Sequence, residues 1–282
     1  MSQSKEAKIP CVLWNYWEND DNGPPPIVEL CRKSWVGAGK FADVRIVTPK
    51  NVSEFLRSEE LPKFFHDMPP VNKADAVRIA LLAKYGGYWA DAGILTTGPI
   101  DAWVFPKASK LGFFVFQDVD RSRVLDNWFI SGTPESPFIQ EWGTRFRLFF
   151  DKPRIHGAHS LKKTPSRIAT HLIVAINKKL RSSPSRIGAW AKFPLSSLPM
   201  YPYFIMHYIA NAMLDTPGLR DEFESMEKVK ASRALALRGL LDKHTLTYDA
   251  AAAISSDVPI HKLNTYRTYS PEELQILESL IC

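Results

Sequence analysis

The sequence predicts an α/β layered fold with a mostly helical second half, and three observations support this prediction. Short runs of β-branched and aromatic residues alternate with segments of helical periodicity in the first half. The second half carries several helix-start signals but few strand-like runs. Of the 282 residues, 45% are hydrophobic and 23% are charged, so the chain can bury a core and is not disordered in composition.

The first half provides the predicted strands. A β-prone run occupies residues 10–17 (PCVLWNYW), and a second run covers residues 43–47 (DVRIV). Between them, three prolines at 24–26 lead into a segment of helical periodicity. Further strands are predicted at 111–117 (LGFFVFQ) and 127–131 (NWFIS). This alternation predicts a sheet with helices packed against it.

The clearest helix is predicted over residues 72–85. Asn72 is its expected N-cap, and Asp75 then falls in the first turn, where a carboxylate suits the helix dipole. Gly86 can adopt the left-handed cap that ends a helix. A short strand over residues 88–90 follows at once. The chain thus predicts a helix, a tight glycine turn and a strand in close succession.

Hydroxyl residues before proline indicate helix starts later in the chain. These pairs are Ser136-Pro137, Thr164-Pro165, Thr216-Pro217 and Ser270-Pro271. Residues 201–214 (YPYFIMHYIANAML) are apolar but too short to span a membrane, so we expect a buried or interfacial helix there. Strand-like character returns at residues 258–263 (VPIHKL).

The charge and cysteine content leave several partner classes open. The net charge of +6 is compatible with phosphate-bearing small molecules, peripheral contact with an anionic membrane, or nucleic acid, and selects none of them. The most basic stretch, residues 178–186 (KKLRSSPSR), indicates a solvated surface, with an anionic partner as the alternative. Cys11, Cys31 and Cys282 lack metal-ligand spacing and fit a reducing compartment.

We expect a cytoplasmic location, including the cytosolic face of a membrane. The first ten residues (MSQSKEAKIP) lack the apolar core of a signal peptide. No uninterrupted apolar run of about 18 residues occurs, so no membrane span is expected. No nucleic-acid-binding motif is recognised, and we expect no nucleic-acid partner.

The predicted helix and the strand after it place carboxylates near a sheet edge. Asp75 and Arg78 are three residues apart and share a helix face, where they form an intrahelical ion pair or support a site on the next strand. Asp91 follows that strand, and ligands of open α/β sheets bind beyond the carboxyl ends of strands. Asp91 could hold Mn²⁺ or Mg²⁺ and, through the ion, a diphosphate, or it could be a turn aspartate.

The order of these residues resembles the DXD-containing core of sugar-nucleotide glycosyltransferases, specifically glycosyltransferase family 32 and the capsular polysaccharide synthesis proteins. The positions that match in register are Asp75, Arg78, Leu82, Tyr85, Gly86, Gly87 and Asp91. The resemblance implies a GT-A-type Rossmann-like nucleotide-sugar-binding domain over residues 1–282. Within it we expect a nucleotide-sugar-binding core at 1–150, a helical acceptor-side region at 151–257 and a closing segment at 258–282.

The resemblance also implies roles for individual residues. Asp91 and Asp75 would be catalytic, with Asp75 contacting donor hydroxyls and Arg78 orienting that carboxylate. Tyr85 and Gly87 would belong to the donor-binding core. In residues 8–17 (KIPCVLWNYW), Trp14 would stack on the nucleotide base, the alternative being core packing.

Three further residues enter the site through the resemblance. Asn127, in NWFISGTPESPF, would contact donor or acceptor hydroxyls or cap a turn. Near the C-terminus, His261 would be a second metal ligand, although a lone histidine is more often structural. Lys262 would meet the diphosphate.

The sequence departs from the family pattern at Gly93, where the second aspartate of the DXD motif is expected. A ligand from the His261-Lys262 segment or a water could replace that acid around Mn²⁺ or Mg²⁺. Alternatively, transfer is independent of a metal, with Lys262 or Arg78 offsetting the charge of the leaving group.

The resemblance implies transfer of a hexosyl or deoxyhexosyl group from a UDP- or GDP-sugar to a saccharide hydroxyl. It further implies retention of anomeric configuration. The alternative is a nucleotide-sugar- or carbohydrate-binding module without turnover.

Overall fold

A computed structural model describes residues 8–18, 23–37, 41–120, 123–151 and 204–281. The predictions at Thr164-Pro165, at residues 178–186 and at Cys282 lie outside these ranges. So does the part of the predicted acceptor-side region between residues 152 and 203.

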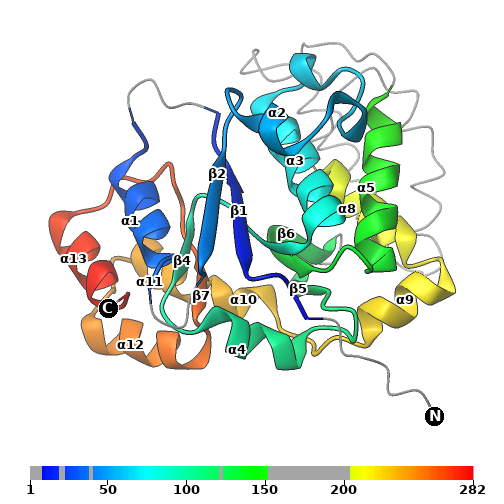
Figure 1. The fold of residues 1–282 in the computed structure, drawn as a ribbon. Coiled ribbons are helices and arrows are strands. Elements are labelled where there is room, and N and C mark those ends of the chain that lie inside the picture. The colour runs from blue at the N-terminus through cyan, green and yellow to red at the C-terminus, as the bar shows by residue number, and fades with distance from the viewer. Residues whose placement is uncertain (1–7, 19–22, 38–40, 121–122, 152–203, 282) are drawn as a thin grey trace, which may run out of the picture.

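A five-stranded mixed sheet forms the centre of the molecule (Figure 1). Its strands, in spatial order, are β2 (Asp43–Val47), β1 (Val12–Tyr16), β3 (Gly87–Ala90), β6 (Arg123–Gly132) and β5 (Phe114–Asp120). β1 is parallel to both β2 and β3, whereas β3–β6 and β6–β5 are antiparallel. A separate antiparallel pair joins β4 (Ile94–Thr96) to β7 (Ile260–Lys262). The predicted α/β Rossmann-like arrangement is confirmed.

Helices cover both faces of the sheet (Figure 1). One face packs against α2 (Val52–Phe55), α3 (Pro70–Tyr85), α5 (Pro137–Phe150), α8 (Ile205–Met213) and α9 (Pro217–Glu224). The other face carries α1 (Pro26–Ser34), α4 (Ile100–Val104), α10 (Ala231–Ala234), α11 (Ala236–Asp242), α12 (Tyr248–Asp257) and α13 (Pro271–Ser279). Helices therefore dominate the described C-terminal half, as predicted.

The alternation of side chains along each strand divides the core in two. In β1, Leu13 and Trp14 are both buried but enter opposite hydrophobic clusters. Tyr88 and Trp89 of β3 divide in the same way. Successive residues of a strand point to opposite faces, so apolar runs such as VLW and YW fill both layers at once.

Helix α3 begins two residues earlier than predicted. Pro70 occupies its first turn and Pro69 the N-cap, because proline has the backbone angle that a helix start needs and lacks the N–H that would remain unpaired there. Asn72 is therefore inside the helix and is not its N-cap. Asp75 lies beyond the first turn, so its carboxylate is held by side chains and not by the helix N-terminus.

The glycine turn after α3 is required by close packing. Gly86 and Gly87 both have positive φ, at 65° and 96°. A Cβ on Gly87 would lie 2.5 Å from the Val12 carbonyl oxygen, and one on Gly86 would lie 2.9 Å from the Gly132 carbonyl oxygen. Only glycine lets β3 enter the sheet directly beside β1 and β6 at this point.

The predicted helix starts are found wherever the structure describes them. The Ser136 hydroxyl accepts a hydrogen bond from the Ile139 N–H, and Ser270 forms a capping box with Glu273. Thr216 occupies the N-cap of α9. The apolar stretch at 201–214 contains the buried helix α8. None of the helices in the described ranges combines the length and the apolar character needed to cross a membrane.

Candidate active site

A cavity of about 340 Å³ lies at the carboxyl ends of β1 and β3, and we call it the strand-end cavity. Its lining includes Tyr16, Trp17, Glu18, Val71, Ala74, Arg78, Trp89, Asp91, Gly93, Lys262, Thr265 and Tyr266. The chain leaves β1 towards β2 on one side, and β3 lies on the other side, so this is where the strand order reverses. Ligands of open α/β sheets bind at such a switch point.

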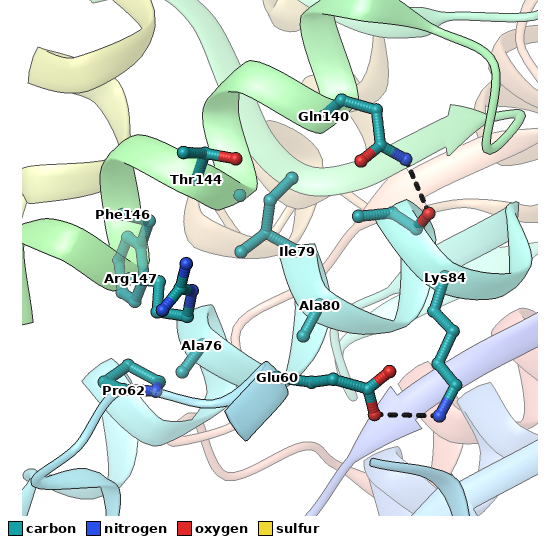
Figure 2. Close-up of a pocket in the computed structure, with 12 residues that line it drawn as sticks. Glu60, Pro62, Ala76, Ile79, Ala80, Lys84, Gln140, Thr144, Phe146 and Arg147 are labelled. Carbon is teal, nitrogen blue, oxygen red and sulfur yellow. Dashed lines mark hydrogen bonds and ion pairs between the residues drawn. The ribbon is translucent and has the colours of Figure 1, made fainter. Parts of the chain in front are cut away.

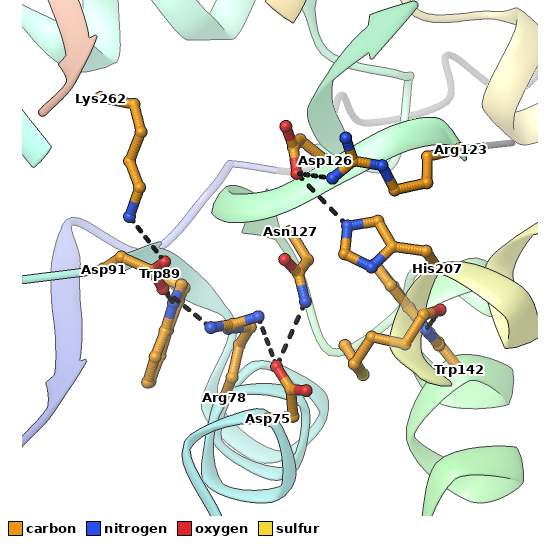
Figure 3. A network of polar contacts seen from close by, with 11 residues as sticks. Asp75, Arg78, Trp89, Asp91, Arg123, Asp126, Asn127, Trp142, His207 and Lys262 are labelled. Carbon is orange, nitrogen blue, oxygen red and sulfur yellow. Dashed lines mark hydrogen bonds and ion pairs between the residues drawn. The ribbon is translucent and has the colours of Figure 1, made fainter. Parts of the chain in front are cut away.

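A continuous chain of charged and polar side chains begins at the lining of this cavity and continues behind it, and we call it the Asp91 cluster (Figure 3). Its members are Lys262, Asp91, Arg78, Asp75 and Asn127. Lys262 Nζ lies 2.9 Å from Asp91 Oδ2, and Arg78 Nη2 lies 2.8 Å from Asp91 Oδ1. Arg78 Nη1 donates to Asp75 Oδ1 at 2.7 Å, and Asn127 Nδ2 donates to the same oxygen at 3.2 Å.

The cluster contains two carboxylates in different electrostatic environments. Burial raises the pKa of Asp75 to about 7, against the lowering effect of the Arg78 charge. Burial also acts to raise the pKa of Asp91, but the charges of Lys262 and Arg78 outweigh it and hold that pKa below its ordinary value. Asp91 is therefore an anion at neutral pH, while Asp75 exchanges a proton near neutrality.

The pairing of β7 with β4 brings Lys262 to Asp91. Lys262 is opposite Ile94, and the Leu263 N–H donates to the Gly93 carbonyl oxygen at 2.7 Å. His261 is the next residue along the strand and therefore points to the other side. Its Nε2 lies 3.2 Å from the hydroxyls of Thr97 and Ser255.

His261 is thus not positioned to be a metal ligand with Asp91. Its side chain is fully buried, and burial lowers its pKa to about 4. His261 lies where a structural histidine would lie: its neutral imidazole contacts hydroxyls from two neighbouring elements. Strand register places Lys262 of this segment, and not His261, in the cluster.

The absence of a second acid at Gly93 has a steric reason. A Cβ at this position would lie 2.7 Å from the Leu263 carbonyl oxygen and 3.0 Å from Cγ2 of Thr265. The segment that delivers Lys262 therefore occupies the space that an aspartate side chain would enter.

Five residues that the resemblance assigned to donor binding do not line the cavity. Asp75 and Asn127 lie behind Arg78 in the Asp91 cluster, and the other three are packed elsewhere. Trp14 is 1% exposed, stacks against Tyr85 with ring centroids 5.4 Å apart, and donates its indole N–H to the Gly86 carbonyl oxygen. The Tyr85 hydroxyl donates to the Phe55 carbonyl oxygen. Gly87 is packed against β1. Trp14 is therefore packed in the core, which was the alternative to stacking on the nucleotide base.

Trp17, which the sequence pattern did not single out, lines the cavity together with Trp89. β1 ends at Tyr16, so Trp17 follows directly after its carboxyl end. Its indole N–H is buried and has no hydrogen-bond partner among the described residues. The expected pattern was a strand that ends in tryptophan, and residues 14 and 17 both fit it until the end of β1 is known.

The described residues do not fit a divalent metal ion at Asp91. Both oxygens of its carboxylate are already paired with cations, His261 faces away, and position 93 has no room for an acid. Within the described ranges, no group of three or more His, Cys, Asp or Glu side chains is placed to hold a metal. Mn²⁺ and Mg²⁺ require oxygen-rich sites.

A second polar pair lies beside the cluster on β6 and α8 (Figure 3). His207 Nε2 is 3.3 Å from Asp126 Oδ1, and both side chains are buried. Burial lowers the pKa of His207 more than Asp126 raises it. Asp126 and Asn127 are adjacent on β6 and point in different directions. Asp126 contacts His207 on α8, and Asn127 belongs to the Asp91 cluster.

The opposite face of α3 borders another cavity, of about 230 Å³, which we call the α3–α5 cavity (Figure 2). It is lined by Ala76, Ile79, Ala80 and Ala83 on α3 and by Gln140, Gly143, Thr144 and Arg147 on α5. The Gln140 amide donates to the carbonyl oxygens of Ala83 and Pro134, and Lys84 pairs with Glu60. No residue that the sequence predicted for the site lies in this cavity.

Comparisons with known proteins match the N-terminal half of the chain, which contributes most of the residues that line the strand-end cavity. The family described as capsular polysaccharide synthesis protein matches residues 1–156. "O-glycosyltransferase braB" from Annulohypoxylon truncatum is 28% identical over 166 aligned residues, covering 52% of this chain and 39% of the relative. "Glycosyltransferase afumC" from Aspergillus fumigatus is 26% identical over 157 residues, covering 49% of this chain and 40% of the relative. The chain thus spans about two fifths of the length of these curated relatives.

Proposed function

Since the chain belongs to the capsular polysaccharide synthesis protein family, we propose that it transfers a hexosyl or deoxyhexosyl group from a UDP- or GDP-sugar to a saccharide hydroxyl. One observation carries this proposal. Arg78, Asp91 and Lys262 come from three separate segments and meet at one cavity, at the point where the strand order reverses. Two relatives that match about half of this chain have names that describe glycosyltransferases.

The cavity offers complementary chemistry for each part of the donor. Lys262 provides a positive charge for the diphosphate. Trp17 provides an aromatic surface for the base, and stacking on a base contributes about 1–3 kcal/mol in other systems. For the sugar hydroxyls, Asp91 provides a carboxylate in the lining. Asp75 and Asn127 lie behind Arg78, outside the lining, and hold the arginine that orients Asp91.

In the transfer, the bond between C1 of the sugar and the diphosphate oxygen breaks, and both electrons leave with the diphosphate. The acceptor oxygen forms the new bond to C1. For the retaining reaction that we propose, the acceptor proton passes to an oxygen of the departing diphosphate on the same face of the sugar. Fixed cations accelerate such a step because negative charge develops on the leaving group.

A panel of UDP- and GDP-sugars tests the proposal, with release of nucleoside diphosphate measured in the presence of mono- and oligosaccharide acceptors. The wild type should consume at least one donor. Asp91→Asn should lower kcat/KM for that donor by about 100-fold, because loss of this carboxylate releases the two cations that it aligns. The Asp118→Asn variant is the matched control, since Asp118 pairs with Lys228 on the exposed surface.

The second candidate, a binding module without turnover, is favoured by Gly93 and gives a different result. Nucleotide sugars would raise the melting temperature of the wild type but would not be consumed with any acceptor. If no donor is either consumed or bound at millimolar concentration, the transferase and the nucleotide-sugar-binding module are both contradicted, and only a module that binds carbohydrate alone is left.

A further inference from the structure

Lys262 is the cation of the Asp91 cluster that a ligand can reach. Its side chain is 21% exposed and lines the strand-end cavity, whereas the Arg78 side chain is 5% exposed and lies between two carboxylates. The Lys262 ammonium contacts Asp91 Oδ2, which is the oxygen that Arg78 does not use. The Lys262 ammonium therefore already pairs with the cavity-facing oxygen of Asp91, which is the one aspartate of the DXD-like motif in this sequence.

The position of this ammonium is fixed from both sides. The hydrogen bond from the Leu263 N–H to the Gly93 carbonyl oxygen and the β4–β7 pairing hold the backbone on either side of residue 262. Asp91 is held by Arg78 and by the Trp89 indole N–H, at 2.8 Å and 2.9 Å. A charge held in place before the reaction needs no reorganisation when the leaving group develops its own charge.

Electrostatics oppose a second cation at this place. Like charges repel, and a divalent ion repels an ammonium or guanidinium group twice as strongly as a unit charge does at the same distance. An ion at Asp91 would meet both Lys262 and Arg78, and the closure of position 93 leaves no second acid to offset the repulsion.

We propose that sugar transfer by this protein does not require a divalent metal ion, and that the Lys262 ammonium stabilises the leaving diphosphate in its place. This inference rests on the proposed transferase function. The bond changes are those given above: C1 leaves the diphosphate oxygen, the electron pair stays on the diphosphate, and Lys262 faces that new charge. The family match covers residues 1–156 and does not include Lys262, whose contact with Asp91 is an observation of this structure.

The first test compares turnover of the best donor in EDTA and in Mn²⁺. The wild type, purified with EDTA, should keep kcat/KM within about 3-fold of its value in millimolar Mn²⁺. The melting temperature gives a second readout: UDP or GDP should stabilise the protein equally in both buffers, because binding to the native state raises stability by linkage.

The second test removes the positive charge of Lys262. Lys262→Met keeps the length of the side chain and should lower kcat/KM by about 100-fold or more, the typical cost of removing one group that stabilises a developing anion. Mn²⁺ should not restore the activity. Lys262→Arg keeps the charge and should remain within about 10-fold of the wild type. Lys228→Met is the matched control, because Lys228 forms an exposed ion pair with Asp118 and does not line the cavity.

The outcomes separate this inference from the proposed function. If EDTA abolishes turnover and Mn²⁺ restores it, the protein is a transferase and metal independence is wrong. If Lys262→Met retains wild-type turnover in EDTA, the role of Lys262 is wrong. If no donor is consumed in either buffer, the proposed function itself fails, and the inference fails with it.

Discussion

The two faces of α3 border cavities of comparable size but opposite character. Towards the strand ends, α3 contributes Asp75 and Arg78, which meet charged residues from β7 and from the end of β3. Towards α5, it contributes Ala76, Ile79, Ala80 and Ala83, and the polar groups there are engaged in local contacts. Cavity size therefore does not identify the candidate site. The candidate site is identified by charged side chains from distant segments that converge where the strand order reverses.

The largest expected effect comes from removing the charge that joins the two acids. Arg78→Met should destabilise the protein by about 3–5 kcal/mol, because it leaves Asp75 and Asp91 without their shared partner in a buried site. Urea denaturation measures the change. Arg238→Met, which breaks an exposed ion pair on α11, should cost less than about 1 kcal/mol. Equal losses in the two variants would contradict the buried character of the cluster.

Asp75→Asn should change how stability depends on pH. The pKa of Asp75 is raised in the folded state to about 7, so the native protein holds this proton more tightly than the unfolded chain does. The stability that this proton provides is fully present below about pH 4 and is lost as the pH rises through about 7. Relative to the wild type, the variant should therefore become more stable between pH 5 and pH 8, as measured by urea midpoints. A difference that is the same at both pH values would show that Asp75 is ionised throughout.

Gly93→Asp restores the second acid of the motif but should not create a working metal site. The new Cβ would meet the Leu263 carbonyl oxygen, so we expect a loss of about 1–3 kcal/mol in unfolding free energy. Gly218→Asp is the control, since nothing lies within 4 Å of a Cβ there. A variant at Gly93 that is as stable as the wild type and gains turnover in Mn²⁺ would overturn the steric account.

The smallest effects compare bulky substitutions on the two faces of α3. Ala74→Phe extends into the strand-end cavity and should lower donor turnover by about 10-fold or more, because it occupies space that the donor needs. Thr144→Phe extends into the α3–α5 cavity and should leave turnover within about 2-fold. The reverse pattern would move the candidate site to the other face of the helix.

Local patterns were sufficient to predict most of the sheet and three of the five members of the Asp91 cluster. Asp75 and Arg78 are one helix turn apart, and a glycine turn leads directly to the strand that Asp91 follows, so these three residues are close for reasons that short segments contain. The helix start at Pro70 was missed because Asn72 offered a competing capping signal.

Predictions that depended on strand register were less successful. The pairing of β7 with β4 decides whether His261 or Lys262 faces Asp91. Lys262 and Asp91 are 171 residues apart in the sequence. Whether Trp14 or Trp17 reaches the cavity depends on where β1 ends. A shift of one residue in a strand reverses the face of every side chain, and neither composition nor spacing fixes that shift.

Hydrogen–deuterium exchange with the most stabilising UDP- or GDP-sugar tests the central claim most directly. If the nucleotide sugar binds in the strand-end cavity, peptides covering residues 260–267 should gain protection and peptides covering α5 should not. The protection at 260–267 should be absent in Lys262→Met. Protection confined to α5, with residues 260–267 unchanged, would contradict the claim that the Asp91 cluster binds the donor.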